Sequence, residues 1–362
     1  MAQDGKIPVG VIGATGMVGQ NYLRLLEDHP WFEVVHAAAS PQSVGQAYEK
    51  AVSGRWLMKE AVPRQARSLT VADVRDVEAA AERCKFIFSA VAMEKQAVRE
   101  IENEYARYLP VISNNAAHRQ TEDVPVIIPE INAQHLDIIP AQQRQRGWSR
   151  GFLVAKPNCS VQSFLPPVYA LIAAGHPVEK LVITTFQAVS GAGYPGPASL
   201  DMIDNVIPYI PGEEQKTEQE PLKILGTVQE GKIQQLETLS ISAHCTRVPV
   251  TDDHLVCVSL KFADQPPGIK TIKAIWESFE GEPQKLKLPS APHPMIVVRD
   301  EHDRPQIEKD RGAGKGMAVT VGRLRPGNVL DIRFASLSHN TVRGAAGGAI
   351  LTAELLKVRK YL

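Results

Sequence analysis

Short apolar runs alternate with amphipathic segments along the first part of the chain. The runs at residues 7–12, 32–39, 85–91 and 109–113 are apolar and mostly rich in β-branched or aromatic residues, which is typical of buried strands. The segments from residue 13 on and at 94–105 space their apolar residues as helices do. Strands that alternate with helices in this way predict a doubly wound parallel sheet.

The second part of the chain combines strands and helices without that regular alternation. The predicted helices cover 161–174, 200–207 and a segment from 211 on, and the predicted strands cover 180–186, 240–250, 254–262 and 331–340. Pro221 indicates a kink or a break in the third helix. We interpret the strands on either side of Thr251-Asp-Asp253 as an antiparallel pair that brings Arg247 and His254 to neighbouring positions. This part therefore favours an α+β domain with a mixed or antiparallel sheet.

Two further segments bear on how the halves are organised. The small residues of 343–357 predict a C-terminal helix that returns to pack on the first domain. Residues 141–150 are polar and predict a surface loop between the halves. At 362 residues, the chain is long enough for two domains with large cores.

Composition narrows the class of protein. Lys+Arg and Asp+Glu both number 40, so nothing favours a nucleic-acid or membrane-surface partner. The four cysteines show no C-x-x-C spacing, which predicts neither a metal site nor a disulfide framework and favours a reducing compartment. Because no apolar leader or membrane-length run is present, we expect a cytoplasmic protein.

A glycine-rich turn follows the first predicted strand. Gly13-Ala-Thr-Gly16-Met-Val-Gly19 stands between that strand and a helix, where glycines let the backbone approach a pyrophosphate and the helix N-terminus attracts it. The second strand ends at Ser40 and Ser43 rather than at a carboxylate, which favours NADP over NAD, although the arginine often used for the 2′-phosphate is absent. The alternative for the glycine cluster is a flavodoxin-like or simple glycine turn. The alternative for the segment at 40–43 is an ordinary surface loop.

Cys159 is the candidate nucleophile. It follows Lys156-Pro157-Asn158, where an apolar run ends and a helix begins. A thiol at a helix N-terminus is expected to have a depressed pKa and to be reactive near neutral pH. The alternative is a buried and inert cysteine.

Together, the glycine turn, Pro157-Asn-Cys-Ser160 and the downstream Arg247-x6-His254 resemble the aspartate-semialdehyde dehydrogenase family. The resemblance covers nearly the whole chain, with further support at 114–119, 187–193, 213–216 and 340–348. Residues 127–132 and 247–254 are similar to the archaeal and fungal branch. The chain departs from many relatives at Asp253, where they have glycine, a residue that takes positive φ more easily.

The resemblance implies a Rossmann-type NADP-binding domain at 1–157, completed by helix 343–362, and a catalytic and oligomerisation domain at 158–342. It implies NADPH-dependent reductive dephosphorylation of L-4-aspartyl phosphate to L-aspartate 4-semialdehyde and phosphate, through a cysteine thioester. This reaction belongs to biosynthesis of lysine, threonine, methionine and isoleucine. The implied partners are these small molecules and a second or further copies of the chain, as a homodimer or homotetramer, with no metal.

Each implied role falls on a matching residue. Cys159 is the nucleophile and His254 the base, Arg247 holds the α-carboxylate and Glu213 the amino group. Lys216 and Arg119 bind phosphate, and Gln187 orients the acyl group. The cofactor-binding residues are Gly13, Thr15, Gly16, Met17, Val18, Ser40, Ser43, Ser89, Ser190, Gly191, Gly193 and Asn340. The alternatives are N-acetylglutamyl-phosphate reductase, malonyl-CoA reductase and a non-catalytic NADP-binding regulator.

Overall fold

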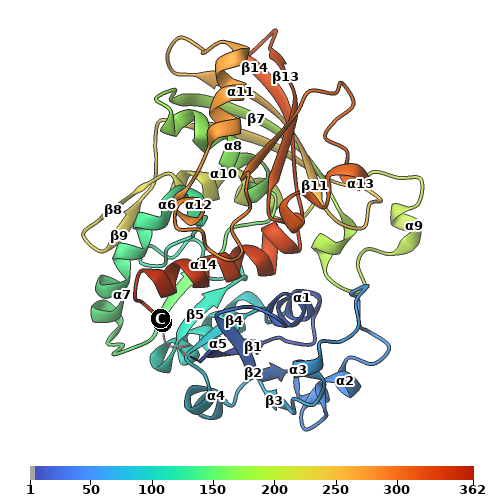
Figure 1. Cartoon of the computed structure of the whole chain (residues 1–362), viewed down its shortest axis with the longest axis vertical. Coiled ribbons are helices and arrows are strands. Elements are labelled where there is room, and N and C mark those ends of the chain that lie inside the picture. The colour runs from blue at the N-terminus through green and yellow to red at the C-terminus, as the bar shows by residue number, and fades with distance from the viewer. Residues whose placement is uncertain (1–4) are drawn as a thin grey trace.

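Two six-stranded β-sheets lie toward opposite ends of the long axis of the molecule (Figure 1). The computed structural model describes residues 5–362. The first sheet comes from the N-terminal part of the chain and the second from the C-terminal part, with helix α14 (Gly347–Val358) between them (Figure 1). Within residues 5–362, no helix is long and apolar enough to cross a membrane.

The first sheet confirms the predicted doubly wound architecture. Its strands are β1 (Ile7–Ile12), β2 (Phe32–Ala39), β3 (Val71–Asp73), β4 (Phe86–Ser89), β5 (Pro110–Ser113) and β6 (Phe152–Ala155). Their order is β3-β2-β1-β4-β5-β6, and every adjacent pair is parallel. Because helices cover such a sheet on both faces, β4, β5 and β6 are buried along their whole length, which explains their unbroken apolar runs.

The helices that accompany this sheet are mostly short. They are α1 (Met17–Leu26), α2 (Tyr48–Ala51), α3 (Arg64–Arg67), α4 (Val77–Arg83), α5 (Lys95–Tyr108), α6 (Pro129–Asn132) and α7 (Ile139–Arg146). Helix α7 corrects the prediction of a loop at 141–150. It ends at Gly147, which adopts a left-handed conformation with φ of 67°. Its glutamines and arginines hid the helix because they show almost no apolar periodicity.

The second sheet is mixed. Its order is β10-β7-β11-β14-β13-β12. Its strands are β7 (Val178–Gln187), β10 (Ser240–Arg247), β11 (His254–Phe262), β12 (Ile296–Arg299), β13 (Val319–Pro326) and β14 (Ile332–Ser338), and β8 (Thr227–Gln229) pairs separately with β9 (Lys232–Gln234). Helices α8 (Val161–Ala173) and α11 (Ile269–Ser278) pack on this sheet. Four further helices are α9 (Ser199–Met202), α10 (Glu213–Ile224), α12 (Glu282–Lys285) and α13 (Ile307–Asp310).

Three predictions about this half were wrong. Strands β10 and β11 do not pair with each other, because β7 lies between them, parallel to β10 and antiparallel to β11. Helix α10 continues through Pro221 to Ile224 without a break. The segment predicted as a helix at 200–207 is helical only as α9.

Helix α14 packs against the first sheet, as predicted from its small residues. It contacts β5, and its buried Ala349, Ile350 and Ala353 join the core formed with β1 and β2. His29 Nε2 lies 2.8 Å from Glu354 Oε1, which fixes the helix to the loop before β2. The C-terminal helix thus packs on the N-terminal sheet and completes its core.

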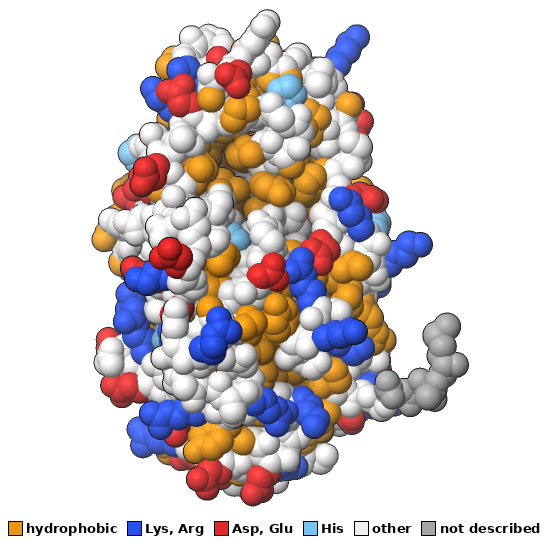
Figure 2. Space-filling model, turned by 90° about the vertical axis from the view of Figure 1, so that its left-hand side faces the viewer, with side chains coloured by type: hydrophobic (Ala, Val, Ile, Leu, Met, Phe, Trp, Pro, Cys, Tyr) orange, Lys and Arg blue, Asp and Glu red, His pale blue; other side chains and the backbone are white. Residues whose placement is uncertain are grey.

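The surface drawn in Figure 2 mixes charges of both signs. Lysine and arginine side chains stand among acidic ones, and hydrophobic side chains gather along the middle of this face, above and below its centre. This mixture agrees with the equal numbers of cationic and anionic residues, 40 of each.

Candidate active site

A cavity of about 320 Å³ forms where the two halves of the chain meet. Residues from the glycine turn, the Asn114 loop, the Cys159 turn, α10 and the end of β10 all line it. They include Met17, Val18, Asn114, Arg119, Asn158, Cys159, Gln187, Ser190, Gly191, Gly193, Glu213, Lys216, Arg247 and Asn340. The fold therefore brings most of the predicted site residues together from distant parts of the sequence.

Cys159 and His254 form a direct pair. Cys159 lies in the turn between β6 and α8, and His254 is the first residue of β11. Cys159 Sγ and His254 Nε2 are 3.1 Å apart. His254 Nδ1 lies 2.9 Å from the Asp253 carbonyl oxygen and 3.2 Å from the Ala188 backbone N–H. The tautomer with its proton on Nδ1 donates to the Asp253 carbonyl and presents the Nε2 lone pair to the thiol.

Burial sets the protonation of this pair. Burial raises the pKa of the Cys159 thiol, and Glu213 raises it further, against the opposing charges of Lys156, Arg119 and Arg247. The predicted depression of the Cys159 pKa was therefore wrong, because desolvation and the charge of Glu213 outweigh the neighbouring cations. Burial also lowers the pKa of His254 to about 4. The resting pair is thus a neutral thiol facing a neutral imidazole.

Gln187 joins three functional positions through the second sheet. As the last residue of β7, it is paired with Arg247 on β10 and with His254 on β11. Arg247 Nη1 donates to the Ala188 carbonyl at 2.7 Å. A side chain on Gly191 would place its Cβ 2.9 Å from Arg247 Nη1, so glycine leaves room for the guanidinium beside the loop. Arg247 and His254 are close, as predicted, but their strands are not adjacent: β7 lies between them, and Gln187 pairs with both residues.

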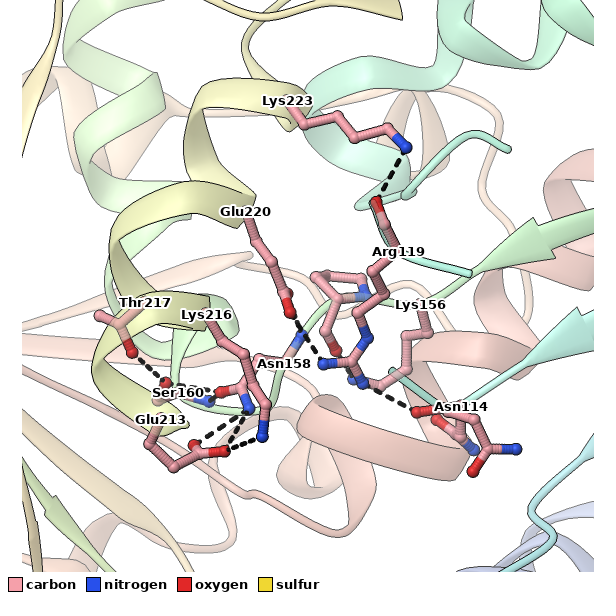
Figure 3. Close-up of polar contacts among 12 residues, drawn as sticks. Asn114, Arg119, Lys156, Asn158, Ser160, Glu213, Lys216, Thr217, Glu220 and Lys223 are labelled. Atoms are coloured by element: carbon pink, nitrogen blue, oxygen red, sulfur yellow. Dashed lines mark hydrogen bonds and ion pairs between the residues drawn. The ribbon is translucent and has the colours of Figure 1, made fainter. Parts of the chain in front are cut away.

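Helix α10 presents a stripe of buried polar side chains to the site (Figure 3). Asn158 Nδ2 donates to both Glu213 oxygens, at 3.1 and 3.0 Å, and Lys216 Nζ donates to Oε1 at 2.7 Å. Burial alone would raise the pKa of Glu213, but Lys216 and Asn158 hold it below its ordinary value. Glu213 is therefore an anion at neutral pH, within 2.7 Å of a cation.

Glu220 links the Arg119 and Cys159 segments (Figure 3). Its Oε1 accepts from Arg119 Nη1 at 2.9 Å, and its Oε2 accepts from the Asn158 backbone N–H at 2.6 Å. Arg119 Nη2 also donates to the Asn114 carbonyl at 2.8 Å. Glu220 was not among the site residues predicted from the sequence. The available signal was its position two helical turns after Glu213, on the same face of α10.

Lys156 lies beneath the Cys159 turn. It is buried, and its Nζ donates to the Pro157 carbonyl at 2.6 Å. Burial and the neighbouring charge of Arg119 lower the pKa of Lys156 to about 7. The lysine thus contributes positive charge near the sulfur when it is protonated. No periodicity in the sequence pointed to this residue.

The glycine turn has the close packing that a dinucleotide site needs. Gly13 has a φ of 77°, and a Cβ there would lie 2.3 Å from the Ala90 carbonyl oxygen. A Cβ on Gly19 would lie 2.2 Å from the Gly13 carbonyl oxygen. Gly16 directly precedes α1 and leaves its N-terminus open. A second cavity of about 150 Å³ is lined by Gly13, Thr15, Gly16 and Ser40, so these residues fit an NADP-binding role.

Asn340 connects the loop that contains Ser190 to the backbone next to His254. Asn340 Nδ2 donates to Ser190 Oγ at 2.8 Å, and Asn340 Oδ1 accepts from the Asp253 backbone N–H at 2.8 Å. The loop assigned to the cofactor is thus connected to the residue that precedes His254.

Two predicted cofactor residues line neither cavity. Ser89 is fully buried at the end of β4 and donates its hydroxyl to Glu102 Oε1 at 2.6 Å. Ser43 is also buried, and its hydroxyl accepts from Arg55 Nη2 at 2.8 Å. Across the described part of the chain, no cluster of His, Cys, Asp and Glu has the arrangement of a metal site.

Comparisons with known proteins identify both halves of the chain. The NAD binding domain of semialdehyde dehydrogenase matches residues 8–139, and the semialdehyde dehydrogenase dimerisation domain matches residues 168–343. The aspartate-semialdehyde dehydrogenase of Aspergillus fumigatus is 44% identical over 369 residues, covering 100% of both chains. The enzyme of Archaeoglobus fulgidus is 42% identical over 360 residues, covering 99% of this chain and 100% of that protein.

A solved structure gives the same assignment. The crystal structure of aspartate-semialdehyde dehydrogenase with NADP from Candida albicans superimposes with a TM-score of 0.90. It is 36% identical and covers 99% of this chain and 100% of the other. The similarity therefore extends over both sheets and the cavity between them.

Proposed function

This chain belongs to the aspartate-semialdehyde dehydrogenase family, and from that premise we propose how its residues reduce L-4-aspartyl phosphate to L-aspartate 4-semialdehyde and phosphate with NADPH. The observation that supports this mechanism most strongly is the 3.1 Å pair of Cys159 and His254. It faces a cavity that also contains Glu213, Arg247 and two candidate phosphate-binding cations, Arg119 and Lys216.

His254 and Cys159 perform the covalent steps. His254 Nε2 takes the thiol proton while Sγ attacks the acyl carbon, the C–S bond forms, the bond to the phosphate oxygen breaks, and phosphate leaves a thioester. NADPH, when bound, supplies the hydride. Reduction of the thioester carbon and cleavage of the C–S bond release the aldehyde, and His254 returns its proton to Sγ. The reverse direction begins with attack of the same thiolate on the aldehyde.

Glu213 and Arg247 select a substrate with both an amino and a carboxylate group. The Arg247 guanidinium can bind a carboxylate with two parallel hydrogen bonds. The Glu213 carboxylate, ionised at neutral pH, suits an ammonium group. An N-acetylated substrate has no cation to offer Glu213, which disfavours the N-acetylglutamyl-phosphate reductase alternative. A regulator without catalysis would need neither the Cys159–His254 pair nor these two residues.

Arg119 and Lys216 provide the phosphate site. Arg119 is positioned from two sides, by Glu220 and by the Asn114 carbonyl. Lys216 is partly exposed, and its Nζ is held by Glu213 Oε1. A divided role follows, in which Arg247 and Glu213 bind the amino-acid end and Arg119 and Lys216 bind the leaving phosphate.

The same proposal covers organisation and place in the cell. We divide the chain into an NADP-binding domain at 1–157, completed by 343–362, and a catalytic and oligomerisation domain at 158–342. Two copies associate through the second domain, as a dimer or as half of a tetramer. All four cysteines are free thiols, which supports a cytoplasmic location.

The test is a comparison of two aldehydes. Phosphate-dependent reduction of NADP is measured with L-aspartate 4-semialdehyde and with N-acetylglutamate semialdehyde. We expect turnover with the first that requires phosphate, and kcat/KM at least about tenfold lower with the second, because a buried Glu213 loses its charged partner. Equal rates with the two aldehydes, or turnover independent of phosphate, would contradict the proposal.

A further inference from the structure

Arg55, which belongs neither to the glycine turn nor to the segment at 40–43, lies beside Ser43. Arg55 Nη2 donates to Ser43 Oγ at 2.8 Å, and Arg55 Nε donates to the Ala51 carbonyl at 3.0 Å. Ser43 itself is only 1% exposed. Its hydroxyl therefore orients the guanidinium instead of facing a ligand directly.

The segment that contains Arg55 is fastened to the glycine turn. Gln20 Nε2 donates to the Thr15 carbonyl at 3.0 Å and to the Arg55 carbonyl at 2.9 Å. Gln20 Oε1 accepts from the Leu57 backbone N–H at 2.8 Å. The Tyr48 hydroxyl donates to the Ala14 carbonyl at 2.8 Å. Arg55 is thus held in a fixed place relative to the turn that faces the pyrophosphate.

The charge of Arg55 is available to a ligand. Within residues 5–362, the ion pairs formed by nearby arginines join Arg24 to Glu60 and Arg67 to Glu49, and none includes Arg55. Ser40, at the end of β2, is exposed and lines the cofactor cavity. The end of this strand is where a doubly wound fold places the adenosine ribose. A partly exposed guanidinium without a carboxylate partner therefore lies next to the predicted 2′-phosphate position.

We propose that Arg55 binds the 2′-phosphate of NADP, with Ser43 fixing its guanidinium and the Ser40 hydroxyl adding a hydrogen bond. This inference rests on the proposed function and names the residue that selects its cofactor. The sequence lacks an arginine directly after the second strand, and the fold supplies one from twelve residues beyond Ser43. A guanidinium recognises a phosphate with paired, charge-assisted hydrogen bonds, and NADH has no group for it to bind.

The test measures dissociation constants for NADPH and NADH by calorimetry, without substrate. Arg55→Ala should weaken NADPH binding by roughly 10- to 100-fold and leave NADH binding unchanged, because one charge-assisted contact is lost. Ser43→Ala should show a smaller loss for NADPH alone. Arg67→Ala is the matched control, since Arg67 lies in the same region but pairs with Glu49, and it should change neither constant. Arg55→Lys keeps the charge and should fall between wild type and Arg55→Ala.

The outcomes separate this inference from the proposed function. Equal weakening of NADPH and NADH in Arg55→Ala and Arg55→Lys, or a matching loss in Arg67→Ala, overturns the assignment of Arg55. Unchanged NADPH affinity in Arg55→Ala overturns it as well, while leaving the proposed function intact. A wild-type protein that binds neither nucleotide overturns both.

Discussion

The side chain of Asp253 destabilises the folded protein next to the site. Its φ is 81°, a conformation that suits glycine, and it is fully buried. Neither carboxylate oxygen has a hydrogen-bond partner among the described residues. Arg311 Nε lies 3.7 Å from Oδ2, and the His339 ring nitrogen Nδ1 lies 3.6 Å from Oδ1. Its backbone meanwhile makes two useful contacts, with Asn340 and His254, that any residue could make.

Replacing Asp253 by glycine should therefore stabilise the protein. Removal of the left-handed strain contributes on the order of 1–3 kcal/mol. Burial raises the pKa of Asp253 from 3.8 to about 7, against the opposing charge of Arg311. The folded state thus holds more protons than the unfolded state between these values, so wild-type stability falls as pH rises through that range. The gain from Asp253→Gly should be larger at pH 8 than at pH 5.

Thermal unfolding at both pH values checks this expectation. Asp252→Gly is the control, because Asp252 precedes Asp253 and is not buried. It should not stabilise the protein at either pH. A lower melting temperature for Asp253→Gly at pH 8, or the same gain at both pH values, would refute the account of Asp253.

The sequence pointed to candidate reactive residues, but it did not show how deeply each one is buried or what surrounds it. Cys159 was a candidate because an apolar run ends and a helix begins there, whereas the role of His254 came only from the resemblance to aspartate-semialdehyde dehydrogenases. The raised pKa of Cys159 could not, because it depends on burial by segments from both halves. Arg55 was missed for a related reason, since its partner Ser43 lies on another loop.

At the scale of elements, helix α10 contributes a row of charged and polar side chains to the site. Glu213, Lys216, Thr217, Glu220 and Lys223 stand three, four, seven and ten residues along from the first, so they share one face (Figure 3). Charged and polar residues at this spacing are typical of a solvated surface helix. The structure shows instead that Glu213, Thr217, Glu220 and Lys223 are buried. Polar periodicity does not distinguish a solvated face from one that lines a site.

Glu220→Gln tests the role of this helix. Removing the charge leaves Arg119 without its carboxylate partner and changes the acceptor for the Asn158 N–H. We expect kcat/KM for phosphate to fall roughly 10- to 100-fold, with the KM for aldehyde changed much less. Steady-state kinetics with each substrate varied in turn gives both values.

The control for that experiment lies on the same helix. Glu218 Oε1 accepts from the Ala243 backbone N–H at 3.0 Å, outside the cavity. Glu218→Gln should therefore leave both KM values near those of the wild type. If Glu220→Gln raises the aldehyde KM as much as the phosphate KM, Glu220 does not act through Arg119.

The order of strands in the second sheet could not be predicted from the sequence. Strands β10 and β11 were placed correctly along the sequence, apart from their ends. Their apparent hairpin was wrong because β7, about 60 residues before β10, inserts between them. Such long-range pairing leaves no local signal, since each strand shows the same alternation in either arrangement.

At the scale of the whole molecule, one face of the second sheet is open in the single chain. Helices α8 and α11 cover the opposite face. The open face presents His244, Thr184, Cys257 and Ala335 in one row across β10, β7, β11 and β14, and Ser242, Val182, Ser259 and Arg333 in the next. Val182 is 46% exposed there. This face is suited to a second copy of the chain, since few charges interrupt it.

Val182→Asp should weaken that association. A carboxylate buried between two copies loses water without gaining a partner. Light scattering coupled to size exclusion should show wild-type dimers or larger assemblies and a shift toward monomer for Val182→Asp. Val329→Asp is the control, because Val329 is 94% exposed and outside this sheet face. A monomeric wild type, or equal behaviour of the two variants, would contradict this interface.

The fold class and the two-part organisation were the most predictable features of the molecule. Alternating strands and helices specified the parallel sheet, and the small residues of α14 indicated its return to that sheet. The cavity between the halves was not predictable in shape, because it depends on how the two sheets are placed. The residues that line it were found through motifs, whereas Glu220, Lys156 and Arg55 emerged only from their contacts.

The central claim is that Cys159 forms the thioester with His254 as its base, and single-turnover kinetics without phosphate tests it most directly. The enzyme is mixed with L-aspartate 4-semialdehyde and excess NADP, and NADPH formation and the mass of the Cys159 peptide are followed together. We expect a burst of about one NADPH per active site, an acyl group on Cys159, and release of that group when phosphate is added. Cys159→Ser should show no burst. A full burst in Cys159→Ser, or an acyl group on a different residue, would contradict the mechanism.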